Sequence, residues 1–96
     1  MRTIEYVRFE SANDVDLIAH RDDLVRLLKE SYGEDFCGAH LAKCDDGSYL
    51  EIIVWGSKEA ADRAAHEMPS DPRAAGFFSQ IGNVHEMRHA EVLHSA

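Results

Sequence analysis

The clearest pattern of apolar and polar positions lies in residues 48–55, which alternate with the two-residue period of a β-strand. One face carries three aliphatic side chains, and the other carries an acid and an indole among apolar neighbours: Leu50, Ile52 and Val54 against Tyr49, Glu51, Ile53 and Trp55. Both faces are therefore largely apolar, and both need to be covered. Because one layer of helices covers only one face of a sheet, we expect a second, separate cover for the face that carries Ile52.

The same periodicities predict the remaining elements. Strands are predicted at residues 2–9, 36–43, 48–55 and 84–94, although the last segment also has a weak helical stripe. Helices are predicted at residues 14–31, 57–68 and 71–80. The order β-α-β-β-α-β is that of a ferredoxin-like α+β sandwich, and we expect residues 1–96 to form a single domain.

The turn between the second and third strands determines which side chains share a face. Asp46-Gly47 is typical of a two-residue hairpin loop. That loop predicts three cross-strand pairs on one side of the sheet: Trp55 with Gly38, Ile53 with His40, and Glu51 with Ala42. Because Gly38 has no side chain, it would leave space beside the indole of Trp55. The sequence therefore predicts a small pocket there.

Composition narrows the classes of function. The formal net charge of −8 argues against binding to nucleic acid, and no run of apolar residues is long enough to cross a membrane. The N-terminal segment lacks the apolar core of a signal peptide, so we expect a cytoplasmic protein. Cys37 and Cys44 would lie on opposite faces of a strand, and we expect both to be reduced thiols.

Three features of the sequence together resemble the antibiotic biosynthesis monooxygenase family. They are the segment DDGSYLEIIVWGSKEAADRAA at residues 45–65, a short helix with a Phe-Phe pair, and a last strand rich in His and Glu. The resemblance implies a dimeric α+β barrel, and the family includes cofactor-independent oxygenases of aromatic polyketides. Those oxygenases pair an Asn with a Trp four residues later on the third strand, and Glu51 stands at that Asn position before Trp55. In the haem-degrading branch, an Asn on the first strand takes part, and the first strand here has none.

The candidate site combines these residues. We expect Trp55 and Phe78 to form aromatic walls and Gly38 to leave space beside the indole of Trp55. Glu51 or His40 would be the base that deprotonates a phenolic substrate. Arg21, which interrupts the apolar stripe of the first helix, is either an anchor for an anionic substrate or a side chain that extends to solvent.

A further motif suggests a different chemistry. His85-Glu86-Met87-Arg88-His89 spells the H-E-x-x-H motif of zinc peptidases, which requires a helix. On a strand, the two histidines would project from points roughly 13 Å apart and could not share one ion. Because we predict a strand, we expect no metal here, and a zinc hydrolase is the least favoured alternative.

The leading hypothesis is a homodimeric monooxygenase that needs no cofactor and acts on a small aromatic or quinol-type compound. The alternative is a non-catalytic dimeric protein of the same fold that binds a small ligand or assists another protein. Such a protein would lack a group with a strongly perturbed pKa in the pocket.

Overall fold

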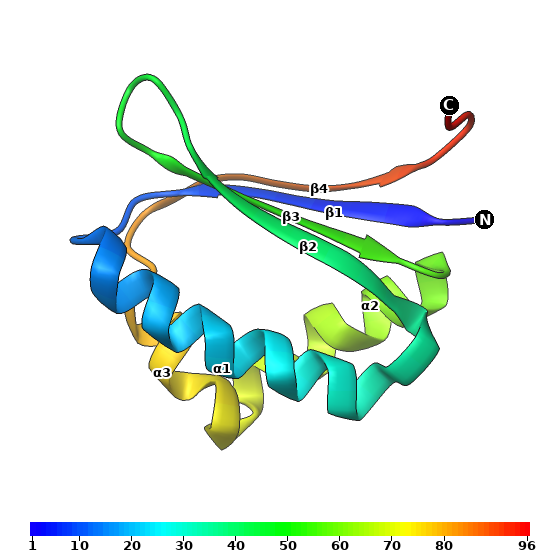
Figure 1. The fold of residues 1–96 in the computed structure, drawn as a ribbon, viewed down its shortest axis with the longest axis horizontal. Helices are drawn as coiled ribbons and strands as arrows, with labels where there is room; N and C mark the ends of the chain where they lie inside the picture. The colour runs from blue at the N-terminus through cyan, green and yellow to red at the C-terminus, as the bar shows by residue number, and fades with distance from the viewer.

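The structure, a computed structural model, describes residues 1–96 and consists of a four-stranded antiparallel sheet with its helices on one face (Figure 1). The strands lie in the order β2-β3-β1-β4, with β1 paired to both β3 and β4. Their bounds are Thr3–Phe9 for β1, Phe36–Lys43 for β2, Tyr49–Trp55 for β3 and Val84–Glu91 for β4. This is the ferredoxin-like α+β arrangement that the sequence predicts, and the last segment is a strand.

The helices are α1 at Asp14–Tyr32, α2 at Lys58–Glu67 and the short α3 at Ala75–Ser79. The side chain of Asn13 accepts a hydrogen bond from the backbone N–H of Asp16 and caps α1, and Gly33, at φ 55°, ends it. Ser57 caps α2 in the same way. None of these helices is both long enough and apolar enough to span a membrane.

The core lies between the helices and the inner face of the sheet. It contains leucines of α1, the small alanines of α2 and aromatic residues of the sheet and α3, among them Phe9, Leu17, Leu28, Trp55, Ala61 and Phe77. Because the alanines have short side chains, α2 lies close to the sheet. Helical spacing in α1 predicts an apolar stripe of Leu17, Ile18, Leu24, Val25 and Leu28. In the structure Ile18 is exposed, and Leu27 is buried instead.

The hairpin between β2 and β3 differs from the predicted one. Its loop has three residues, because Cys44 pairs with Ser48 and the N–H of Gly47 donates to the carbonyl of Cys44. Gly47 has φ 89°, in the left-handed region of backbone conformation. This conformation closes a hairpin loop of three residues, one more than the predicted two. The extra residue shifts the register by one, so that His40 faces Ile52. This shift turns the side chains of residues 38–43 to the face opposite the predicted one, whereas Phe36, which lies before an irregularity in the register, still faces Trp55.

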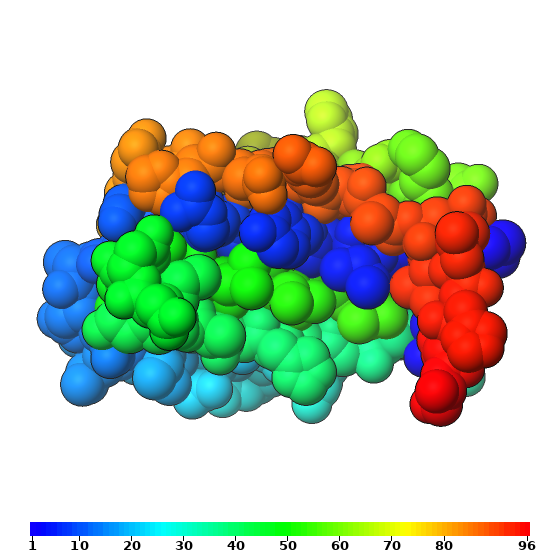
Figure 2. All heavy atoms as spheres, turned by 90° about the horizontal axis from the view of Figure 1, so that it is seen from above, coloured from blue at the N-terminus to red at the C-terminus, as the bar shows by residue number.

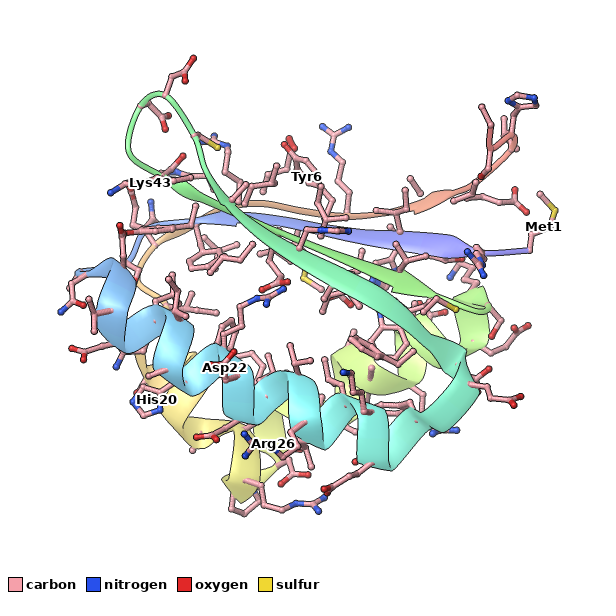
Figure 3. All side chains as sticks on the ribbon, viewed as in Figure 1. Met1, Tyr6, His20, Asp22, Arg26 and Lys43 are labelled. Atoms are coloured by element: carbon pink, nitrogen blue, oxygen red, sulfur yellow. The ribbon has the colours of Figure 1, made fainter.

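No helix or strand covers the outer face of the sheet, and only the C-terminal residues cross one end of it (Figure 2). Figure 2 shows the four strands side by side on this face, and Figure 3 shows Tyr6 pointing away from the helices. Alternation along β1 and β3 places an apolar group here: Ile4, Tyr6, Leu50, Ile52 and Val54. The predicted two-residue loop would also place Ala39 and Leu41 on this face, but the observed register places both with the core.

The left-handed backbone at Gly47 generates the first prediction. Gly47→Ala should lower the free energy of unfolding by about 1–2 kcal/mol, because a Cβ is disfavoured at this φ. Gly47→Asn should cost less, since Asn tolerates the conformation better. Urea denaturation measures both, with Asp45→Ala in the same loop as the control. Equal stability of Gly47→Ala and this control would contradict the account of the loop.

Candidate functional site

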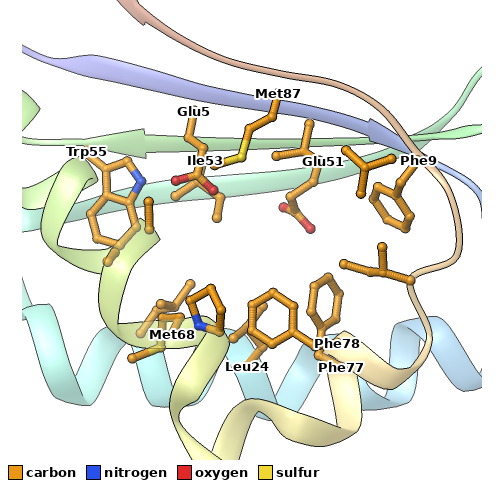
Figure 4. A pocket seen from close by; sticks show the side chains of 17 residues that line it. Glu5, Phe9, Leu24, Glu51, Ile53, Trp55, Met68, Phe77, Phe78 and Met87 are labelled. Atoms are coloured by element: carbon orange, nitrogen blue, oxygen red, sulfur yellow. The ribbon is translucent and has the colours of Figure 1, made fainter.

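An apolar cavity of about 230 Å³ lies between the inner face of the sheet and the helices (Figure 4). Its walls come from β1, β3, β4 and all three helices, and most of its lining is hydrophobic, including Phe9, Leu24, Ile53, Met68, Phe77 and Phe78. Two lining residues on β4 are well exposed, Val84 at 47% and Met87 at 53%. The cavity therefore opens to solvent beside β4. A cavity of this kind suits a small, largely apolar ligand.

Trp55 forms one end of the cavity and is only 1% exposed. Tyr32 and Phe36 pack against its ring edge-to-face, with centroid distances of 5.2 and 5.8 Å. These contacts hold the indole in one orientation. Its buried Nε1–H has no acceptor in hydrogen-bonding geometry. In Figure 4 the indole nitrogen is on the side of Glu5, so the N–H is directed toward that carboxyl group.

Glu51 projects into the cavity from the middle of β3 and is held by Arg21 of α1. Arg21 Nε donates to Oε2 of Glu51 and Nη2 donates to Oε1, both at 2.8 Å. The two side chains are 15% and 6% exposed, so the ion pair is largely desolvated. Burial raises the pKa of Glu51 above its ordinary value, and the guanidinium opposes that rise.

Glu5 of β1 is a second carboxyl group in the cavity. Burial raises the pKa of Glu5, and nearby Glu51 adds to the rise, while His89 and the indole N–H of Trp55 lower it. His89, on the neighbouring strand β4, places Nε2 3.5 Å from Oε1 of Glu5. Its other ring nitrogen is 3.3 Å from Oδ1 of Asp62 on α2. Unlike Glu51, Glu5 has no guanidinium to neutralise it.

The structure brings together only some of the residues that the sequence nominated. Glu51, Trp55 and Phe78 line the cavity. The placement of His40 and Gly38 beside them was wrong, because the register shift puts both on the outer face.

Gly38 has a different role from the one expected. It has φ 144° and lies next to an irregularity in the β2 register, so the position needs glycine for its backbone. Arg21 neither lines the cavity nor extends to solvent, since it binds Glu51 instead.

The H-E-x-x-H segment lies on strand β4, as predicted. His85 is paired with Glu10 at 3.4 Å, whereas His89 faces Glu5 on the inner side of the sheet. No group of three metal-ligating side chains is arranged to hold an ion. The two histidines therefore belong to separate clusters.

Sequence reasoning did not select Glu5 or Met87 as site residues. A signal for Glu5 exists, because the alternation of β1 places this acid on the same face as Val7 and Phe9. An acid in the middle of an apolar inward face indicates either a buried partner or a functional group. No comparable signal marks Met87, which reaches the cavity only through the pairing of β4 with β1.

Known structures share this fold over nearly the whole chain. A candidate antibiotic biosynthesis monooxygenase from Chloroflexus aurantiacus J-10-fl matches with a TM-score of 0.70 at 16% identity, over 100% of this chain and 97% of that one. SnoaB, a cofactor-independent oxygenase from Streptomyces nogalater, matches with a TM-score of 0.66 at 18% identity, over 98% of this chain and 95% of that one.

A third similar structure is a dimeric ferredoxin-like protein of unknown function from Jannaschia sp. CCS1, with a TM-score of 0.67 at 14% identity, over 96% of this chain and 100% of that one. No protein-family model and no curated protein matches the sequence. At identities this low, the likenesses confirm the fold that the resemblance implied. The chain is structurally similar to antibiotic biosynthesis monooxygenases.

The buried ion pair generates the second prediction. Arg21→Met should lower the free energy of unfolding at neutral pH by about 3–5 kcal/mol, because Glu51 is left as an uncompensated buried charge. Without the guanidinium the pKa of Glu51 rises further above its unfolded value. The loss should therefore be greatest above the raised pKa of the folded state, shrink as the pH falls through it, and disappear below the unfolded pKa.

Chemical denaturation at several pH values tests this expectation. Arg26→Met is the matched control on the same helix, since its pair with Asp23 is exposed and contributes little. Adding Glu51→Gln to Arg21→Met should recover part of the stability and remove the pH dependence. A pH-independent loss in Arg21→Met would mean that packing, and not charge, accounts for its effect.

Proposed function

We propose that this protein is a cofactor-independent monooxygenase that oxidises a small phenolic or quinol-type compound in the cavity. The observation that supports this most directly is the presence of two buried carboxyl groups with raised pKa in a predominantly apolar cavity. A carboxylate with a raised pKa is a stronger base toward a phenol than a solvated carboxylate is. Trp55 and Phe78 supply the aromatic walls, and the Arg21–Glu51 pair supplies a polar site between them.

The chemistry needs no external reductant. A phenol with a hydrogen para to its hydroxyl group reacts with one O₂ to give one quinone and one water. One oxygen atom forms the new C=O bond, and the other leaves with the two hydrogens lost by the substrate. The substrate loses four electrons and dioxygen gains four. The protein's part is to bind the ring, remove the phenolic proton and exclude bulk water.

The alternative is a dimeric protein that binds a small ligand without reaction. Perturbed carboxyl groups favour the enzyme, because a purely apolar binding cavity gains nothing from burying two acids. The oxygenase SnoaB has the same fold, which is consistent with an oxygenase but does not by itself define the reaction.

We also propose that two copies of the chain associate through the outer face of the sheet. The apolar group centred on Ile52 has no cover within the chain, and burying it would form an interface of the order of 2,000 Å². A two-fold dimer places the same face on both partners. The similar protein from Jannaschia sp. CCS1 is described as dimeric.

Occupation of the cavity generates the third prediction. Binding of 4-nitrophenol should quench the fluorescence of Trp55, the only tryptophan, because the indole forms a cavity wall. Ala65→Leu should weaken this binding strongly by filling part of the cavity, with an overpacking cost of about 1–3 kcal/mol. Fluorescence titration and thermal denaturation measure the two effects.

The matched control is Ala19→Leu, at an exposed position of α1 away from the cavity, which should bind as wild type does. Oxygen uptake with 1-naphthol, together with formation of 1,4-naphthoquinone, then tests the reaction itself. Binding without any oxygen uptake by this probe or related para-unsubstituted phenols would favour the binding protein. Undiminished binding by Ala65→Leu would place the ligand elsewhere.

The fourth prediction concerns assembly. Ile52→Asp should convert the dimer into a monomer or an aggregate, because the carboxylate would be buried in an apolar interface. Analytical ultracentrifugation at micromolar concentration measures the state. Val15→Asp, which changes an apolar residue that is 77% exposed on α1, should leave the dimer intact. A monomeric wild type would rule out the proposed assembly.

A further inference from the structure

Glu5 is the inner member of a row of three ionisable side chains that leads from the cavity toward the surface. The row continues through His89 to Asp62, with separations of 3.5 Å and 3.3 Å. The exposed fraction of the side chains rises along it, from 13% through 19% to 52%. The row therefore connects a buried acid with solvent through one imidazole ring.

The two ring nitrogens of His89 face different partners. Nε2 is buried and points at Glu5 without a hydrogen bond, and Nδ1 points at Asp62 on α2. Imidazole can accept a proton at one nitrogen and release another from its second nitrogen. A distance of 3.5 Å is slightly too long for a hydrogen bond, and such contacts often shorten when a ligand closes the site.

Glu51, the other carboxyl group of the cavity, is less suited than Glu5 to accept a proton. Both of its carboxylate oxygens accept hydrogen bonds from Arg21, so the guanidinium stabilises the ionised form and disfavours its protonation. Glu5 faces the unpaired indole N–H of Trp55 instead. A phenolic oxygen placed between these two groups would donate its proton to Glu5 and, once ionised, accept the hydrogen bond from Trp55.

We propose that Glu5 is the catalytic base of this site and that His89 and Asp62 carry its proton between the cavity and solvent. The proposal rests on the proposed oxidation of a phenol. In the first step the phenolic O–H bond breaks, the proton binds Glu5 and the electron pair stays on the phenolate oxygen. In the second, the carboxyl proton passes to Nε2 of His89 while Nδ1 releases its proton to Asp62 and then to water. Glu5 is a catalytic residue, and His89 and Asp62 are positioning residues.

Other charged groups also act on this row. Glu51 on β3 raises the pKa of Glu5. Arg21 of α1 offsets the charge of Glu51, and Lys58 of α2 donates a hydrogen bond to Asp62. Removing His89 leaves these groups unchanged. The change in the pKa of Glu5 that results from replacing His89 therefore reports the contact between Glu5 and His89.

The test uses the fluorescence of Trp55 as a function of pH without any ligand. Wild type should show a transition as Glu5 ionises beside the indole, and Glu5→Gln should lack it. His89→Gln should move the transition to higher pH, because His89 lowers the pKa of Glu5. The control His85→Gln, on the same strand but paired with Glu10, should leave it in place.

Activity supplies a second readout with 1-naphthol. The acid limb of the pH profile of kcat/KM should match the fluorescence transition and shift with it in His89→Gln. An unshifted fluorescence transition in His89→Gln, or a transition that persists in Glu5→Gln, would overturn the proposal. An acid limb that stays in place while the fluorescence transition moves would show that Glu5 is not the base.

These outcomes are distinguishable from failure of the proposed oxidation. If no phenol is oxidised by the wild type, the oxidation and the role of Glu5 as its base both fail. The ligand-free titration would still show whether Glu5, His89 and Asp62 are coupled.

Discussion

The central position of β3, with apolar side chains on both of its faces, is the constraint on which the other layers depend. Its inner face packs against α1 and α2, and its outer face has no cover within the chain. Burial of apolar surface is the main driving force for packing, so this strand requires helices on one side and favours a partner on the other. The cavity and the proposed dimer face are thus two sides of the same strand.

Two acids on the inner face are compensated in different ways. Arg21 neutralises Glu51 with a bidentate pair, which makes that carboxylate a fixed structural charge beside the cavity. Glu5 has no guanidinium partner, and its pKa is lowered only by the imidazole of His89 and the indole N–H of Trp55. Because a buried acid without a strong cation is costly to ionise, Glu5 is the group whose proton is more readily exchanged. This difference separates a structural role from a chemical one.

The aromatic residues around Trp55 connect the fold to the site. Tyr32 ends α1 and Phe36 begins β2, and both pack edge-to-face on the indole. Burial and the hydrogen bond to Glu67 raise the pKa of Tyr32 to about 12, so its hydroxyl group stays protonated and continues to donate to that carboxylate. The orientation of the Trp55 N–H is therefore fixed by the junction between a helix and a strand, before any ligand binds.

Local patterns in the sequence determined the elements and their order, because alternation, helical spacing and end caps such as Asn13 act over only a few residues. They also selected Glu51, Trp55 and Phe78 as residues of one site, and all three line the cavity. Local patterns could not determine the register of β2, because Asp46-Gly47 is compatible with both a two-residue and a three-residue loop.

Only the tertiary structure decided between these loops. The left-handed conformation of Gly47 closes a loop of three residues, and the additional loop residue shifts the register of β2 by one. His40 therefore lies on the outer face, away from the site. The contact of Glu5 with His89 also depends on tertiary structure, because these residues are 84 positions apart in sequence and come together only when β4 pairs with β1. Sequence spacing carries no information about a contact made at that distance.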